Sequence, residues 1–476
     1  MADERARTTG RPPAPPADAG AVRAAAAPGG GGGSGARGPG GVTEARIVAA
    51  EVFAELRAGD LLDPAFERRA ARLDARDRRW AQELLWGALR RRSWLDALLA
   101  ARVRGGLARL DADLADLLRL GAYQLLYMGS VPAYAAIAQT VELAKRRHGI
   151  GASKLANAVL RRIDRERAEL HVAMPRDPVD ALALLHSHPR WLVQRWMERW
   201  DAAETERLLR ANNEEAPLIA RPFNVVREQL ESMLEAAGVT VAEAPLVRDS
   251  LRLGGTGSLT ELGAFRQGLF FMQDVASTLV THYAAVAPGS TVADLCAAPG
   301  GKALELSRTA ALVVAADRSA GRLQRVLANV RRMDARNIRL LVADARDVAL
   351  TPVDAVLVDV PCTGTGTFRR HPDARWRLKA SDLAVMPALQ RSILRAAAGV
   401  VRPGGLLVYS TCSLEPEEND AVVDAFLAEA GDGWSVEPPP PGTVPDTVLD
   451  GGRLRVLPQA HGTDGAFAAR LRRAGG

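Results

Sequence analysis

Two of the three cysteines in this chain follow apolar segments that have the composition of β-strands. Cys362 comes three residues after Asp359, which ends one such run, and Cys412 ends the run 405–412. A thiolate is a strong nucleophile, and a nearby carboxylic acid can exchange a proton with the group under attack. We expect a helix from Pro416, whose N-terminus would lower the pKa of the Cys412 thiol. Most free cysteines are small buried hydrophobes, but packing alone explains poorly why both of these follow a strand.

A glycine-rich segment, 294–302 with the sequence DLCAAPGGK, lies between a predicted strand and a predicted helix. Glycines let the backbone approach a ligand closely, and a helix N-terminus offers free N–H groups. The segment matches neither the Walker A pattern nor G-x-G-x-x-G. By itself it fits a ligand loop and an ordinary tight turn of an α/β protein about equally well.

Acidic residues close several further predicted strands. The runs 311–317 and 338–344 end on Asp317 and Asp344, and the next strand ends on Asp359. Ligands of open α/β sheets bind at the carboxyl ends of the strands, and an acid about one βαβ unit after the glycine loop bonds the ribose of a nucleoside cofactor. The pattern therefore predicts a Rossmann-like α/β domain with Asp317 at its cofactor site.

Taken together, DLCAAPGGK, the Asp-ended strands, DVPCTGTG with RRHPDARW, and YSTCSLEPEEN resemble the motifs of the RNA 5-methylcytosine methyltransferases. The resemblance runs in order from about Gln273 to Arg472. It implies S-adenosylmethionine as cofactor and thiolate attack on carbon 6 of cytosine, which makes carbon 5 reactive toward a methyl donor. By this resemblance Cys412 is the nucleophile, Cys362 assists product release, and Asp359 is the acid near ring nitrogen 3.

The same resemblance assigns the cofactor contacts. It places Asp317 at the ribose, Asp344 at the adenine amino group, and residues 297–301 at the methionine part. Lys302 fits a site role and a solvated helix lysine alike, and for Cys296 we expect packing or a backbone contact. The full expected set is Cys296, Ala297, Ala298, Pro299, Gly300, Gly301, Lys302, Asp317, Arg322, Asp344 and Asp359.

The region before the catalytic motifs has helical periodicity without strand signals, which predicts an all-helical domain. Helices are expected from Thr43 onward, and the further ones are 79–91, 94–103, 111–127, 133–147 and 154–169. The segments LRLGAYQLLYMGSVPAYAAIAQTVELAK and KLANAVLRR resemble the RNA-binding NusB domain. Within the methyltransferase family this fusion is typical of the Sun/Fmu/RsmB type, so the resemblance implies a cytosine of 16S ribosomal RNA as substrate.

Basic residues gather in this helical region. They are Arg68, Arg69, Arg72, Arg76, Arg78, Arg79, Arg90–Arg92 and Lys145–Arg147. One such run is usually a solvated helix face, but their repetition on a domain of this kind favours contacts with RNA phosphates. The formal net charge of +6 and the pI of about 9.6 suit a polyanionic partner.

A chain of 476 residues is too long for one ordinary core. Its composition predicts a disordered Ala/Gly/Pro-rich tail and four ordered parts. These are the tail at 1–42, a helical NusB-like domain at 43–170, a helical linker at 171–215, a small α+β RNA-binding segment at 216–272 and the methyltransferase domain at 273–473.

The three cysteines are widely spaced and odd in number, which predicts no disulfide framework, and no Cys/His spacing suggests a metal site. No apolar run reaches the length of a membrane span. We therefore expect a cytoplasmic monomer that binds 16S ribosomal RNA, either free or in an assembly intermediate, without a metal or a membrane. Three alternatives stay open: the same chemistry on transfer or large-subunit RNA, DNA cytosine methylation with the Pro-Cys cysteine as nucleophile, and a non-catalytic ribosome-assembly factor.

Overall fold

The computed structural model describes residues 41–255 and 257–475. These residues form two compact units: one holds most of 41–173, and the other holds 174–475 with the short segments 60–64 and 89–93. The predicted disordered tail, 1–42, lies outside the described residues apart from its last two positions. One of these, Val42, is fully buried.

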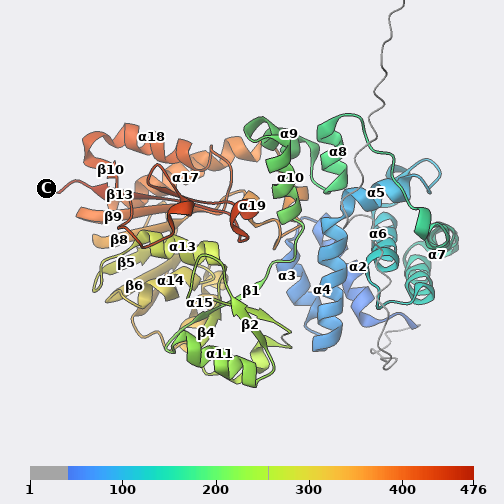
Figure 1. Cartoon of the computed structure of the whole chain (residues 1–476), viewed down its shortest axis with the longest axis horizontal. Helices are drawn as coiled ribbons and strands as arrows, with labels where there is room; N and C mark the ends of the chain where they lie inside the picture. The colour runs from blue at the N-terminus through green and yellow to red at the C-terminus, as the bar shows by residue number, and fades with distance from the viewer. Residues whose placement is uncertain (1–40, 256, 476) are drawn as a thin grey trace, which may run out of the picture. The chain divides into compact units, whose positions relative to one another are not determined.

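The first unit is helical, as the periodicity predicted (Figure 1). Its leucine stripe on α6, with Leu114, Leu117, Leu118 and Leu125, is buried between neighbouring helices. The two helices expected at 133–147 and 154–169 are one element, α7, whose helical backbone is interrupted at Gly149. The helices that begin in this region are α2 (Glu44–Arg57), α3 (Leu62–Ala70), α4 (Ala75–Arg90), α5 (Arg92–Ala100), α6 (Ala112–Tyr127) and α7 (Ala133–Arg165).

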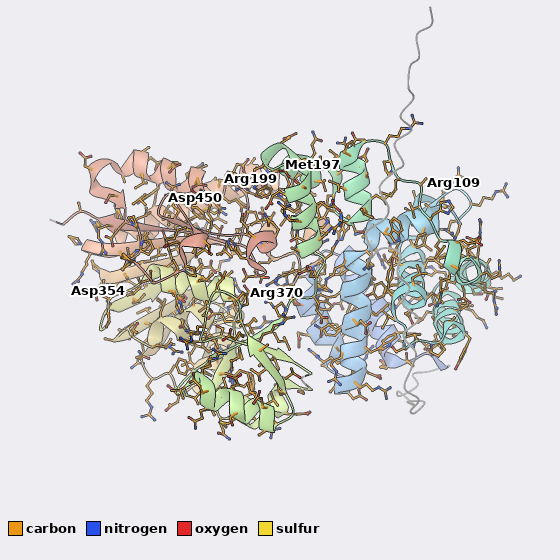
Figure 2. All side chains as sticks on the ribbon, in the orientation of Figure 1. Arg109, Met197, Arg199, Asp354, Arg370 and Asp450 are labelled. Carbon is orange, nitrogen blue, oxygen red and sulfur yellow. The ribbon has the colours of Figure 1, made fainter. Side chains whose placement is uncertain are left out.

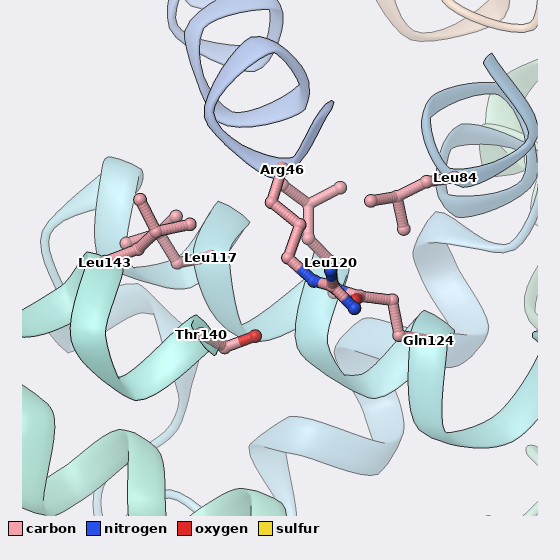
Figure 3. Close-up of a pocket in the computed structure, with 7 residues that line it drawn as sticks. All are labelled: Arg46, Leu84, Leu117, Leu120, Gln124, Thr140 and Leu143. Carbon is pink, nitrogen blue, oxygen red and sulfur yellow. The ribbon is translucent and has the colours of Figure 1, made fainter. Parts of the chain in front are cut away.

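A small, mostly apolar cavity lies inside this helical unit (Figure 3). Its volume of about 10 Å³ is roughly that of one water site. The Arg46 guanidinium reaches into it and donates to Gln124 Oε1 at 2.7 Å, and burial lowers the pKa of Arg46 to about 10. The cavity is too small for an organic ligand. We therefore interpret it as the space around a buried arginine whose guanidinium is hydrogen-bonded within the protein. Its lining residues are Arg46, Leu84, Leu117, Leu120, Gln124, Thr140 and Leu143.

The second unit begins with three helices and a small antiparallel sheet of order β2-β3-β1-β4. Ala220, Leu230, Leu251 and Phe270 bury the face of the sheet beneath α11. This arrangement confirms the expected small α+β segment. The elements from the start of the second unit to the end of this sheet are α8 (Pro178–Leu185), α9 (Arg190–Arg199), α10 (Ala202–Ala211), β1 (Leu218–Pro222), α11 (Arg227–Ala236), β2 (Thr240–Glu243), β3 (Leu251–Gly254), α12 (Gly263–Arg266) and β4 (Phe270–Met272).

A large mixed sheet forms the rest of the second unit. Five parallel strands stand in the order β9-β8-β5-β6-β7, and β13 pairs antiparallel with β9. The sheet confirms the predicted Rossmann-like domain, although β7 ends two residues before Asp344. The strands are β5 (Thr291–Asp294), β6 (Leu312–Asp317), β7 (Ile338–Val342), β8 (Val353–Asp359), β9 (Val401–Thr411), β10 (Trp434–Val436), β11 (Leu449–Asp450), β12 (Arg453–Val456) and β13 (Ala466–Arg473).

Helices cover both faces of the large sheet (Figure 1). Successive residues of β5 point to opposite sides, so Val292 packs in the core under α13 and Ala293 in the core under α17. The prediction that a helix starts at Pro416 is wrong, because α18 begins at Asp420 after a turn. The helices of this part are α13 (Val275–Ala284), α14 (Gly301–Ser307), α15 (Ala320–Arg332), α16 (Ala374–Arg377), α17 (Asp382–Gly399), α18 (Asp420–Ala430) and α19 (Pro458–His461). No helix among the described residues is both long and apolar enough to cross a membrane.

Candidate active site

The carboxyl ends of β8 and β9 bring the two strand-end cysteines together. These strands are parallel neighbours in which Asp359 is paired in register with Ser410. The Sγ atoms of Cys362 and Cys412 are 3.2 Å apart, and both side chains are half-buried. The structure thus places side by side two thiols that are separated by 50 residues in sequence.

Close backbone packing holds the two cysteine segments together. The N–H of Gly366 donates to the carbonyl oxygen of Cys412 at 3.0 Å, and Gly366 accepts from the N–H of Gly465 at 2.8 Å. A Cβ atom on Gly366 would lie 2.7 Å from the Cys412 oxygen and 2.8 Å from Gly465 Cα. Only glycine therefore fits where the three segments meet.

The environment of Cys362 favours its protonated form. Its hydrogen bond with Cys412, followed by burial, raises the pKa of the Cys362 thiol well above the ordinary value. The negative charges of Glu418 and Asp359 act in the same direction. Cys362 is consequently a thiol rather than a thiolate at neutral pH.

Asp359 and Lys302 form an ion pair beside the cysteines. Lys302 Nζ lies 2.7 Å from Asp359 Oδ2, and Ser410 Oγ donates to Asp359 Oδ1 at 2.9 Å. Burial opposes the charged form of Lys302, but Asp359 and Asp294 outweigh it and raise the pKa of this lysine. Of the two interpretations left open for Lys302, the geometry supports a site position, because only 15% of its side chain is exposed.

Asp294 is a site residue that was not among those expected from the sequence. It ends β5 and is buried, and neither of its carboxylate oxygens has a hydrogen-bond partner within the described part of the chain. Burial above all, together with the charge of Asp359, raises the pKa of Asp294 to about 7 despite the opposing effect of Lys302. Its position at a strand end in DLCAAPGGK was the available signal. An unpartnered buried carboxylate of this kind fits a cationic ligand.

The glycine loop runs from β5 into α14 and is held by β6 and α15. The N–H of Ala297 donates to Ala316 O at 2.9 Å, and the Arg322 guanidinium donates to Ala298 O at 2.8 Å. Gly300 has φ 105°, and a Cβ there would lie 3.0 Å from Val326. Around it, Cys296 and Gly301 are half-buried, Pro299 is exposed, and Ala297 and Ala298 are buried. Burial raises the pKa of the Cys296 thiol well above its usual range, so Cys296 is not a second nucleophile.

The two remaining acids lie on neighbouring strands but differ in their surroundings. Asp317 is buried at the end of β6, where its Oδ1 accepts from the N–H of Ser319 at 2.9 Å and Arg322 lies 3.4 Å from its Oδ2. Asp344 follows β7 and is paired with Arg346 at 2.6 Å, which lowers the pKa of Asp344 to about 2. Asp317 therefore belongs to the edge that holds the glycine loop, whereas the Asp344 carboxylate is already engaged by its own neighbour.

A buried ion cluster links the segments before α13, after Cys362 and before β13. Asp274 pairs with Arg369 at 3.0 Å and with Arg370 at 2.6 Å, and Asp464 pairs with the same two arginines at 2.5 Å and 2.6 Å. Figure 2 labels Arg370 near the small sheet. RRHPDARW contains the two arginines, but nothing in that motif indicated that they pair with Asp274 and Asp464.

Five parallel strands, three of which (β5, β6 and β8) end on an aspartate, a glycine loop after β5 and an antiparallel strand beside β9 define a Rossmann-like methyltransferase. The chain belongs to the 16S rRNA methyltransferase RsmB/F family, whose model matches residues 283–472. Two more models match: the NusB family over residues 43–165, and the RsmF/B-like ferredoxin-like domain over 188–260.

Individual relatives span nearly the whole chain. The probable ribosomal RNA small subunit methyltransferase B of Synechocystis sp. is 35% identical over 84% of this chain and 92% of its own length. The ribosomal RNA small subunit methyltransferase B of Pseudomonas putida is 35% identical over 90% of this chain and 98% of its own. The crystal structure of PH0851 superposes with a TM-score of 0.75 at 27% identity, over 90% of this chain and 99% of that one.

The family depends on S-adenosylmethionine, and the residues at this edge fit that cofactor. Its methionine part carries an ammonium group and a sulfonium centre, and the unpartnered carboxylate of Asp294 is the complementary charge. The buried carboxylate of Asp317 suits ribose hydroxyls. Among the described residues, no group of three or more His, Cys, Asp or Glu side chains could hold a metal ion.

Proposed function

We propose that this chain transfers a methyl group to carbon 5 of a cytosine in 16S ribosomal RNA, through a covalent bond between Cys412 and carbon 6. The observation that carries the proposal is the pair of thiols, Cys362 and Cys412, 3.2 Å apart at the edge of the sheet that fits the cofactor. A single cysteine would suffice for attack on the ring. The second thiol fits an enzyme that must also release its covalent product.

The environment of Cys362 supports different roles for the two thiols. A thiolate, not a thiol, attacks carbon, and the raised pKa of Cys362 keeps that residue protonated. Attack therefore falls to Cys412. As the Cys412–carbon 6 bond forms, the electron pair of the ring double bond moves to carbon 5 and toward ring nitrogen 3. Asp359 then acts as the acid: it passes a proton from its Lys302 partner to nitrogen 3 and so neutralises the negative charge that develops there.

S-adenosylmethionine, when bound, supplies the methyl group. Loss of the carbon 5 proton to a base then restores the ring double bond and expels the Cys412 sulfur as thiolate. The Cys362 thiol, 3.2 Å away, is placed to donate a hydrogen bond to that departing sulfur. The pair Lys302–Asp359 holds the carboxylate in place during both halves of the reaction.

The choice of 16S ribosomal RNA rests on the family description, which names 16S rRNA, on the relatives named for ribosomal RNA of the small subunit, and on the NusB match. The target base must leave its stack to reach the thiols, so an unpaired or loop cytosine is the expected substrate. We place the reaction in the cytoplasm, acting on free RNA or on an assembly intermediate.

Bisulfite sequencing of ribosomal and transfer RNA tests this proposal. A deletion strain should lack one methylated cytosine of 16S RNA, and the wild-type chain should restore it while Cys412→Ala should not. Loss of a methylated cytosine from transfer or large-subunit RNA instead would reassign the substrate. An unchanged methylation map would leave the protein a non-catalytic RNA-binding factor.

A further inference from the structure

Glu418 is a fully buried carboxylate in the turn between β9 and α18. Its Oε1 accepts from the N–H of Thr363 and from Gln390 Nε2, both at 2.9 Å. Its Oε2 accepts from Ser413 Oγ at 2.5 Å and from the hydroxyl of Thr363. These donors are neutral N–H and O–H groups. A buried carboxylate is costly to desolvate, so a position of this kind needs a reason beyond packing.

Two of the three residues whose groups donate to the Glu418 carboxylate directly follow the two cysteines. Thr363 comes after Cys362, and Ser413 comes after Cys412. Gln390 of α17, which also bonds Glu418, donates to the carbonyl oxygen of Pro361 at 3.0 Å, one residue before Cys362. One carboxylate therefore ties together the two chain segments that carry the thiols.

The turn that presents Glu418 is itself anchored to β9. Tyr409 donates its hydroxyl to the Glu418 carbonyl oxygen at 2.5 Å. Asn419 accepts from Thr411 Oγ1 at 2.6 Å and donates to Ser413 O at 2.9 Å. These hydrogen bonds fix the Glu418 carboxylate relative to β9, and the two cysteine segments bond to it in that position.

We propose that Glu418 is a positioning residue that sets the separation and orientation of the Cys362 and Cys412 thiols. Its importance for catalysis rests on the proposed function, in which both thiols act on one cytosine. The geometric role itself requires neither RNA nor cofactor. Glu418 also adds negative charge near Cys362, which favours the protonated form of that thiol.

The rate at which the two thiols couple to a disulfide measures their separation directly. Oxidised dithiothreitol is the reagent: one protein thiolate attacks its disulfide, and the second displaces reduced dithiothreitol, so two protein thiols are oxidised and one reagent disulfide is reduced. Mass spectrometry of peptides identifies the Cys362–Cys412 pair. We expect the wild-type chain to couple readily and Glu418→Ala to couple about tenfold more slowly or worse, since this variant cannot form the hydrogen bonds to a charged group.

Two further variants make the test specific. Glu418→Gln keeps the shape and lets the rotatable hydroxyls of Thr363 and Ser413 accept instead of donate, so it should restore most of the coupling rate. Glu415 is the matched control, because it is buried in the same turn but bonds Arg195 and Trp196. Glu415→Ala should lower the melting temperature without slowing the coupling.

Each outcome decides the matter. Equal coupling rates in the wild type and Glu418→Ala, absence of coupling in the wild type, or equal slowing by Glu415→Ala would overturn the positioning role. If Glu418→Ala does not fold, failure of Glu418→Gln to support coupling in a folded chain would overturn it. RNA methylation, assayed separately, shows whether a failure belongs to this inference or to the proposed function. If Glu418→Ala couples slowly but the wild-type chain does not methylate RNA, only the proposed function is contradicted.

Discussion

At the scale of single residues, the two thiols should fail in different ways when removed. Under the proposed mechanism, Cys412→Ala removes the group that bonds carbon 6, so methylation should fall to background and no RNA adduct should form. Cys362→Ala leaves the attack intact but slows release, so an RNA–protein species should survive denaturing electrophoresis. Radiolabelled RNA incubated with cofactor measures both. If only Cys412→Ala accumulates the RNA–protein species, the two roles are reversed. Cys362 would then be the nucleophile, as in DNA cytosine methylation.

The pKa of Asp294 predicts a pH dependence of cofactor binding. A carboxyl group with a pKa of about 7 is protonated below that pH, and only its ionised form attracts an ammonium group. The affinity for S-adenosylhomocysteine should therefore fall as pH drops below about 7, by at most about tenfold per pH unit. Titration calorimetry from about pH 5.5 to about pH 8.5 spans this range on both sides, and Asp294→Asn should flatten the profile and weaken binding at the alkaline end.

The same group has an opposite effect on the stability of the protein without cofactor. Its pKa is about 3.9 in an unfolded chain and about 7 when folded, so between these values the folded state binds more protons than the unfolded state. The contribution of Asp294 to the free energy of unfolding should consequently decrease as pH rises through this window and level off above it. Asp294→Asn should remove that slope in chemical denaturation, and an unchanged slope would show that Asp294 ionises normally.

At the scale of elements, three segments pack closely at Gly366. This packing predicts that adding a single methyl group there lowers stability and activity. Gly366→Ala pushes a Cβ into backbone atoms of Cys412 and Gly465, which should cost about 1–3 kcal/mol of stability. It should also displace Cys412 and slow methylation more than the stability loss explains. Gly399→Ala, at the end of α17 where a Cβ meets no atom within 4 Å, is the control and should be neutral or stabilising by up to about 1 kcal/mol. Denaturation and turnover of both variants test the prediction.

The strands and their acidic ends were predictable because period and composition are local properties. Asp317 and Asp359 stand at the ends of β6 and β8 as the sequence indicated. The partners of Glu418 were not predictable, since its bonds to Thr363 and Gln390 depend on how distant segments pack. The start of α18 was misplaced because Pro416 favours a first helical turn, but here it lies in the turn that presents Glu418.

At the scale of the whole molecule, the ion pairs revise the expected RNA-contacting face. Several of the basic residues pair with glutamates of their own unit: Arg69 with Glu55 at 2.5 Å, and Arg72 with Glu44 and Glu51 at 2.6 Å and 2.9 Å. A guanidinium already paired with a carboxylate attracts phosphate less strongly. Lys145 and Lys154 on α7 are exposed instead.

This difference predicts which cations bind RNA. Lys145→Ala with Lys154→Ala should weaken RNA binding and reduce the slope of log affinity against log salt, by about 0.7 for each phosphate of single-stranded RNA that the variant no longer neutralises. Arg72→Ala should leave the slope unchanged and reduce only stability. Filter binding across salt concentrations measures both. If the two variants reduce the salt slope equally, the paired arginines contact RNA as well.

The antiparallel strand β13 has a consequence for the synthesis of the chain. Gly465 and Asp464 immediately precede β13, and they close against Gly366 and against Arg369 with Arg370. The ribosome adds these two residues well after Cys412, and a nascent chain cannot complete the closure before they emerge. A polypeptide released between the two points contains the glycine loop and both thiols but lacks the segment that closes them together. Catalytic competence thus requires residues 464 and 465 to have been synthesised, which happens after the glycine loop and both thiols have been made.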